Sequence, residues 1–157
     1  MKTLIALILA AFAASAVADG GSRLTAPNNP KWKAECGSCH LAYPPQLLTA
    51  DNWRSLMGGL DRHFGANATL TPQENTEILA YLERYSASSP AHSATTLRIS
   101  DTPWFRREHR EVAAKLWTQA AVKSRSNCAA CHTAAERGNW SESSIRLPGG
   151  QRWKDRD

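Results

Sequence analysis

The sequence predicts a mainly α-helical fold with two small helical units in tandem, and two observations carry this prediction. The pattern Cys-x-x-Cys-His occurs once in each half of the chain, at residues 36–40 and 128–132. Between the two copies, apolar residues recur at steps of three and four after recognisable helix starts, which places them on one helix face. We therefore expect a first unit at residues 19–90 and a second at residues 91–157.

Residues 1–18 are expected to form a secretory signal peptide. Lys2 precedes an apolar run over residues 4–14, within the usual length of about 7–15 residues. The Ala-Val-Ala at 16–18 fits the small-x-small cleavage pattern, so the mature chain is expected to begin at Asp19. The run is shorter than the roughly 20 residues that span a bilayer. We expect a periplasmic protein without a membrane span; an uncleaved N-terminal anchor is the alternative.

In the first unit, the sequence predicts two helices after an irregular segment over 19–30 that is rich in Gly, Pro and Asn. One helix is expected over about 50–63, although each glycine at 58–59 costs up to about 1 kcal/mol there. The second is expected over about 71–85, because Thr-Pro-Gln-Glu at its start supplies a capping threonine, a proline at the first helical position and a capping-box glutamate. The apolar stripe of the first helix consists of Trp53, Leu56, Met57, Leu60 and His63.

The second unit is expected to follow a linker over 86–96 that is rich in Ser, Ala and Pro. A brief alternation over 95–99 predicts a short strand. Thr102-Pro103 predicts another helix start. The tail after Gly138 has little periodicity and is expected to wrap the second site as a loop. The stripe of the predicted helix consists of Phe105, His109, Val112, Leu116 and Ala120.

The repeated pentapeptide predicts two covalently attached c-type haems. Two thiols three residues apart can bond to the two vinyl groups of one haem, and the adjacent histidine can then bind the iron. All four cysteines belong to the two motifs. We expect His40 and His132 to be the proximal iron ligands. The expected thioether sites are Cys36, Cys39, Cys128 and Cys131.

Three other interpretations of the cysteines are weaker. Paired cysteines in four-cysteine zinc sites usually lie about 15–20 residues apart, whereas Cys39 and Cys128 are 89 positions apart. A zinc site would also leave the histidine after each pair unexplained. Disulfides are conceivable in an exported protein, and a dithiol redox motif would need a βαβ context that the sequence lacks.

The second axial ligand of each iron decides between an electron carrier and a catalyst. The candidates are His63, His109, His92 and Met57. His63 and His109 lie on apolar stripes, 23 residues after His40 and 23 before His132, and we expect them to bind the two irons. His92 in the polar linker is expected to be solvated, and Met57 to be a core residue. The pairing could be crossed between the two units.

The formal net charge of +5 does not indicate nucleic-acid binding. The basic residues are scattered, and a protein exported from the cytoplasm meets no genome. The ionised propionates of two haems would lower the charge further.

The chain resembles the diheme cytochrome c family of bacterial periplasmic electron carriers. The resemblance implies a mostly helical fold, two covalent haems and two histidines on each iron. It also implies electron transfer from a membrane b-type or quinol-linked donor to a small c-type cytochrome. The segments that carry it are residues 35–45, 60–65, 102–105 with 108–109, and 127–138 apart from 133–134.

We therefore expect an electron-transfer protein and not an enzyme. Two histidines on each iron would leave no open coordination position. The alternatives are a dihaem enzyme of the peroxidase kind and a haem-based ligand sensor, each of which needs one exchangeable axial position.

Overall fold

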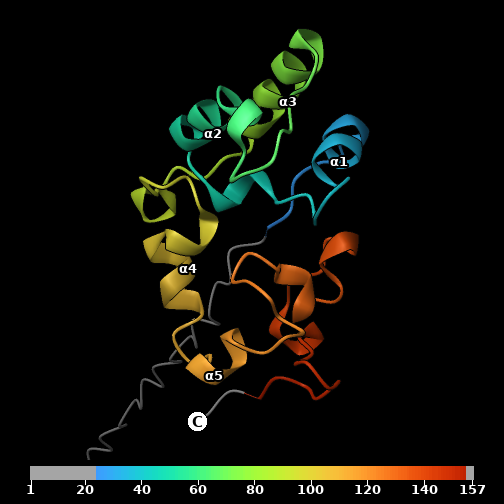
Figure 1. Cartoon of the computed structure of the whole chain (residues 1–157), viewed down its shortest axis with the longest axis vertical. Helices are drawn as coiled ribbons and strands as arrows, with labels where there is room; N and C mark the ends of the chain where they lie inside the picture. The colour runs from blue at the N-terminus through green and yellow to red at the C-terminus, as the bar shows by residue number, and fades with distance from the viewer. Residues whose placement is uncertain (1–23, 155–157) are drawn as a thin grey trace, which may run out of the picture.

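The computed structural model describes residues 24–154, and these residues form a mainly helical fold (Figure 1). The α-helices are α1 (Pro30–Cys36), α2 (Ala50–Met57), α3 (Pro72–Arg84), α4 (Pro103–Glu108) and α5 (Ala114–Trp117). Short 3-10 helices join them: η1 (Pro45–Leu47), η2 (Leu60–Arg62), η3 (Pro90–His92), η4 (Ile99–Asp101), η5 (Cys128–Ala130), η6 (Ala135–Arg137) and η7 (Glu142–Ser144).

The described residues contain isolated β-bridges but no strand. The predicted mainly α fold is confirmed, and the strand predicted at 95–99 is wrong. That segment contains Leu97 in a left-handed conformation, with φ of +59°, and leads into η4. A left-handed residue turns the chain and interrupts an extended run.

Helix α3 begins and ends as predicted. The Thr71 hydroxyl accepts the Glu74 N–H at 3.3 Å, and the Glu74 carboxylate accepts the Thr71 N–H at 3.0 Å. These reciprocal bonds are a complete capping box, with Pro72 at the first helical position. Tyr85 caps the other end.

Helices α2 and α4 are shorter than predicted. Helix α2 ends at Met57 with Gly58 as its cap, so η2 and His63 lie beyond the helix. Paired glycines stop a helix because their unfolded states carry high entropy. Helix α4 ends at Glu108 and is capped by His109, whose ring donates to the Phe105 carbonyl at 2.9 Å. That carbonyl also accepts the His109 N–H at 3.1 Å, so the histidine itself closes the last turn.

The main hydrophobic core lies between α2 and α3. Met57 is 4% exposed there, which confirms its prediction as a core residue. Figure 1 shows α1, α2 and α3 gathered at one end of the long axis, with α5 and the segment after it toward the other. The cluster consists of Leu48, Trp53, Met57, Leu60, Ile78, Tyr81 and Leu82.

The predicted linker is packed against the first unit. The Asn52 side chain accepts the Ala94 N–H at 2.9 Å and donates to the Ala94 carbonyl at 3.1 Å. A domain boundary at residue 90 stays a prediction.

The predicted signal peptide lies outside the described residues. Within 24–154, no helix is long and apolar enough to cross a bilayer.

Candidate functional site

The first Cys-x-x-Cys-His motif begins at the C-terminal end of α1. Asn29 caps this helix by accepting the Trp32 N–H at 2.9 Å, and Pro30 occupies its first position. Cys36 is the last helical residue, and Gly37 caps the helix through its N–H to the Lys33 carbonyl. The helix thus delivers Cys36 half-buried, while Cys39 and His40 lie exposed in the turn that follows.

His40 and His63 lie face to face. Their ring centroids are 6.2 Å apart and their planes meet at 21°. The Nδ1 of His40 donates to the Leu41 carbonyl at 2.8 Å, which leaves Nε2 free to bind a metal. Burial lowers the pKa of His63, and the neighbouring His40 lowers it further.

The second motif lies on η5, and His132 closes that turn through its N–H to the Cys128 carbonyl at 2.8 Å. Its ring centroid lies 6.1 Å from that of His109, with the planes at 71°. The pKa of His132 is lowered to about 4 by burial, with a smaller contribution from His109. Burial also lowers the pKa of His109. Both imidazoles are therefore neutral at pH 7, which is the form that binds a metal.

The spacing of both histidine pairs fits one iron between two imidazoles. Each metal–nitrogen bond is about 2 Å long, and the nitrogen lies roughly 1 Å from its ring centre, so the two centres should lie about 6 Å apart. The observed values are 6.2 and 6.1 Å. The structure thus brings His40 to His63 and His132 to His109, without crossing between the units.

The four thiols do not converge on a shared metal site within the described residues. Burial raises the pKa of Cys36 and of Cys128 to about 11, so both are protonated at pH 7. Among residues 24–154, no group of three or more His, Cys, Asp or Glu side chains is arranged to hold a metal ion.

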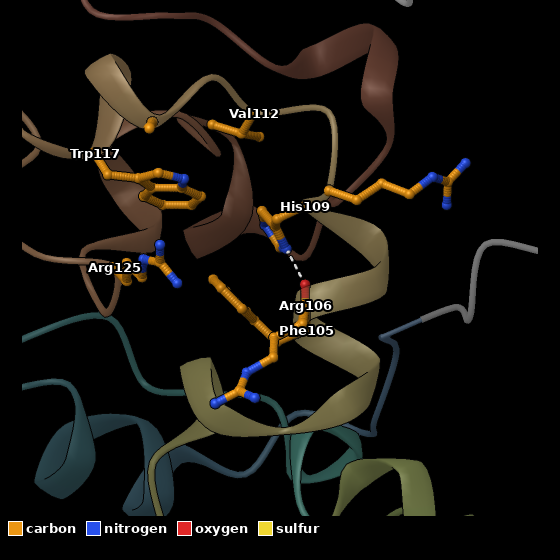
Figure 2. A pocket seen from close by; sticks show the side chains of 8 residues that line it. Phe105, Arg106, His109, Val112, Trp117 and Arg125 are labelled. Carbon is orange, nitrogen blue, oxygen red and sulfur yellow. Dashed lines mark hydrogen bonds between the residues drawn. The ribbon is translucent and has the colours of Figure 1, made fainter.

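One cavity borders the first motif, and another borders the His109 side chain. The larger one, of about 820 Å³, lies beside Cys39 and His40 and is also lined by Trp32, Arg137 and Trp140; it falls within the usual range of about 300–1,000 Å³ for ligand pockets. The smaller one, of about 240 Å³, surrounds the outer side of His109 (Figure 2). Its lining consists of Phe105, Arg106, His109, Arg110, Val112, Ala114, Trp117 and Arg125.

His92 is not the solvated residue that the sequence predicts. It is 7% exposed, and its ring stacks on Trp104 with centroids 4.8 Å apart and planes at 23°. Its Nδ1 is buried without a hydrogen-bond partner among the described residues. The Ser- and Pro-rich composition around His92 predicts a linker, but η3 packs against α4, and Trp104 of α4 covers the His92 ring.

Aromatic neighbours of the histidines were not identified as site residues from the sequence. Phe105 stacks on His109 at 4.0 Å, and its position four residues earlier on the same stripe was the available signal. Trp140 lies 5.2 Å from the ring of His132.

Tyr43 is a further missed neighbour, whose ring stacks on His40 at 4.7 Å. Its hydroxyl donates to the Ser126 carbonyl. The pKa of that hydroxyl is raised by burial and by the nearby Cys128.

Comparisons with known proteins agree with this geometry. The chain is similar to the diheme cytochrome c of Shewanella baltica OS155, with 38% identity, a TM-score of 0.72, and coverage of 82% of this chain and 100% of that one. It is also similar to the diheme cytochrome c (DHC) of Rhodobacter sphaeroides, with 43% identity, a TM-score of 0.64, and coverage of 74% of this chain and 100% of that one. No protein of curated function matches.

The sequence profile described as dihaem cytochrome c matches residues 32–140. This range contains both Cys-x-x-Cys-His motifs and all four histidines of the two pairs. The chain therefore belongs to the dihaem cytochrome c family, and its cofactors are two haem c groups.

Proposed function

We propose that this protein is a periplasmic electron carrier in which both haem irons are six-coordinate. His40 and His63 bind the first iron, and His132 and His109 bind the second. The single observation that carries this proposal is the spacing of about 6 Å within both histidine pairs, which fits a shared iron. The thioethers form at Cys36, Cys39, Cys128 and Cys131.

The chain's own residues hold the imidazoles in place before any electron moves. Hydrogen bonds from Nδ1 of His40 and of His109 to backbone carbonyls set the tautomer and the ring orientation. Phe105 and Tyr43 restrict His109 and His40 by stacking. Haem supplies reversible one-electron chemistry at its iron.

Two fixed histidines per iron support a carrier over an enzyme. A catalyst of the peroxidase kind or a ligand sensor needs an axial position that exchanges. His109 is held on two sides, by its own hydrogen bond to Phe105 and by the Phe105 ring at 4.0 Å. An imidazole held in this way should dissociate from the iron only slowly.

The redox partners belong to the same proposal. A membrane b-type cytochrome or a quinol-linked protein is the donor, and a small c-type cytochrome is the acceptor. The support is the family membership together with the signal-like residues 1–18.

Carbon monoxide titration of the reduced holoprotein tests the proposal. We expect the six-coordinate spectrum to stay unchanged, because carbon monoxide needs a free or readily vacated axial position. Rapid binding at one haem would contradict six-coordination and favour the enzyme or the sensor. A pyridine assay run in parallel should give two haems per chain, as the family membership requires.

A further inference from the structure

The Tyr43 side chain contacts the histidine of the first motif and the segment just before the second motif. Its ring stacks on His40 with centroids 4.7 Å apart and planes at 22°. Its hydroxyl donates to the carbonyl of Ser126, a residue 83 positions away in the sequence. Ser126 lies two residues before Cys128, the first cysteine of the second motif.

The Ser126 carbonyl belongs to a loop that positions the second motif. The Asn127 side chain donates to the Val122 carbonyl at 3.0 Å, and the Asn127 N–H donates to the Ser124 carbonyl at 3.0 Å. Val122 is 3% exposed. The backbone of Ser126 is therefore held in a well-anchored segment, so a displacement of Ser126 should also displace the start of η5.

A second hydrogen bond also joins the surroundings of the two motifs. Lys33 donates to the Glu136 carbonyl at 3.4 Å, but its side chain is exposed and long. The Tyr43 bond is partly buried and comes from a rigid ring, so it fixes position at a lower cost in entropy. On its inner side, Tyr43 packs against the α2–α3 core.

We propose that Tyr43 is a positioning residue that fixes the two haem sites relative to each other. Its ring sets the orientation of the His40 imidazole, and its hydroxyl holds the segment before Cys128. The distance between the irons and the interaction between their potentials should therefore change when the hydroxyl or the ring of Tyr43 is removed. This inference rests on the proposed assignment of His40 as an iron ligand.

Tyr43→Phe tests the hydroxyl, because it keeps the stacked ring and removes only the bond to Ser126. Ser86→Ala is the control, since the partly buried Ser86 hydroxyl also donates to a backbone carbonyl, that of Glu83 at 2.9 Å, and Ser86 lines neither of the two cavities. Each holoprotein is measured by pulsed electron paramagnetic resonance for the iron–iron distance distribution, and by redox titration for both potentials.

We expect Tyr43→Phe to retain two haems, to broaden the distance distribution and to shift at least one potential, while Ser86→Ala matches the wild type. Wild-type behaviour of Tyr43→Phe would overturn the proposal. Equal broadening in both variants would overturn it too, because it would indicate general loosening. A high-spin wild-type spectrum would instead contradict the proposed axial ligands, and this outcome is visible before any variant is made.

Tyr43→Leu tests the ring. We expect the g-values of the first haem to move in Tyr43→Leu and to stay near the wild type in Tyr43→Phe. Unchanged g-values in Tyr43→Leu would remove the orienting role from the ring. The Phe variant decides the hydroxyl's role on its own, because it conserves the packing.

Discussion

The two haem sites share one motif but differ in their surroundings. At the first site the histidine planes are close to parallel, at 21°, and His40 is exposed. At the second they are close to perpendicular, at 71°, and burial lowers the pKa of His132 to about 4. The comparison teaches that the pentapeptide determines which atoms bind the haem. The packing around each motif determines the relative orientation of the imidazole rings and their exposure to solvent.

The charge also differs between the two halves. Residues 19–90 carry six basic and seven acidic side chains, whereas residues 91–157 carry twelve basic and seven acidic ones. Arg106, Arg110 and Arg125 meet around the pocket beside His109 (Figure 2). The positive field of the protein therefore originates around the second haem.

Removing a distal histidine should produce the largest effect and separate the two sites. His63→Ala should leave the first iron high-spin, and His109→Ala should do the same to the second, because each iron would lose one of its two proposed axial ligands. Electron paramagnetic resonance of the oxidised protein measures this. A low-spin signal of full intensity in His109→Ala would remove His109 from the ligand set.

The first motif should require glycine at position 37, whereas the second motif has alanine at the corresponding position. A Cβ at Gly37 would lie 2.3 Å from the backbone oxygen of Lys33, so Gly37→Ala should destabilise the protein by about 1–3 kcal/mol. The corresponding residue of the second motif is Ala129, and Ala129→Gly should cost only about 0.5–1 kcal/mol. Chemical denaturation of both holoproteins compares them, and equal losses would show that the Lys33 carbonyl yields.

His92 is buried against Trp104 and is not among the proposed iron ligands, so its removal should affect stability and not spectra. His92→Ala should lose about 1–3 kcal/mol, because the ring is buried against Trp104. Both irons should stay low-spin. A high-spin signal in this variant would mean that His92 is an iron ligand after all.

His92 should also make the stability of the folded protein depend on pH. Burial lowers the pKa of His92 in the folded protein, so the unfolded chain takes up a proton first as the pH falls. Stability should then decrease below about pH 6.5, and this part of the decrease should be absent from His92→Ala. Denaturation midpoints of the two proteins between pH 5 and pH 7.5 give the comparison, and parallel curves would contradict it.

The smallest expected difference is spectroscopic. The relative orientation of two imidazole planes sets the splitting of the iron d orbitals, so near-parallel and near-perpendicular pairs give different low-spin signals. We expect the oxidised wild type to show two such signals, with the larger maximal g-value from the second haem. His63→Ala should remove one signal and His109→Ala the other. A single shared signal would contradict the difference in ring angle.

Local signals in the sequence predicted the parts of the structure that depend on neighbours along the chain. The capping box at Thr71 and the core position of Met57 were correct because a few adjacent residues determine each. The sequence predicts a helix that continues through the glycines at 58–59 despite their low helix propensity, whereas α2 stops in front of them. Both distal histidines were chosen from helix stripes, yet they lie at or beyond helix ends.

What the sequence did not reveal are contacts between distant segments. The polar neighbours of His92 predict a solvated side chain. Its burial arises from α4, which comes later in the chain. Tyr43 carried no local signal for its bond to Ser126. Such contacts depend on how the segments pack, and residue type and spacing alone do not encode them.

The scarcity of buried side chains in the second half has a consequence for biogenesis. Beyond residue 102, the buried apolar side chains among the described residues are Phe105, Val122, Ala134 and Ala135. So few groups cannot offset the entropy of ordering that much chain. The haems must supply the missing interior, so the polypeptide without haem should stay open and accessible to the enzymes that attach the haem. Attachment would then trigger compaction, and not follow it.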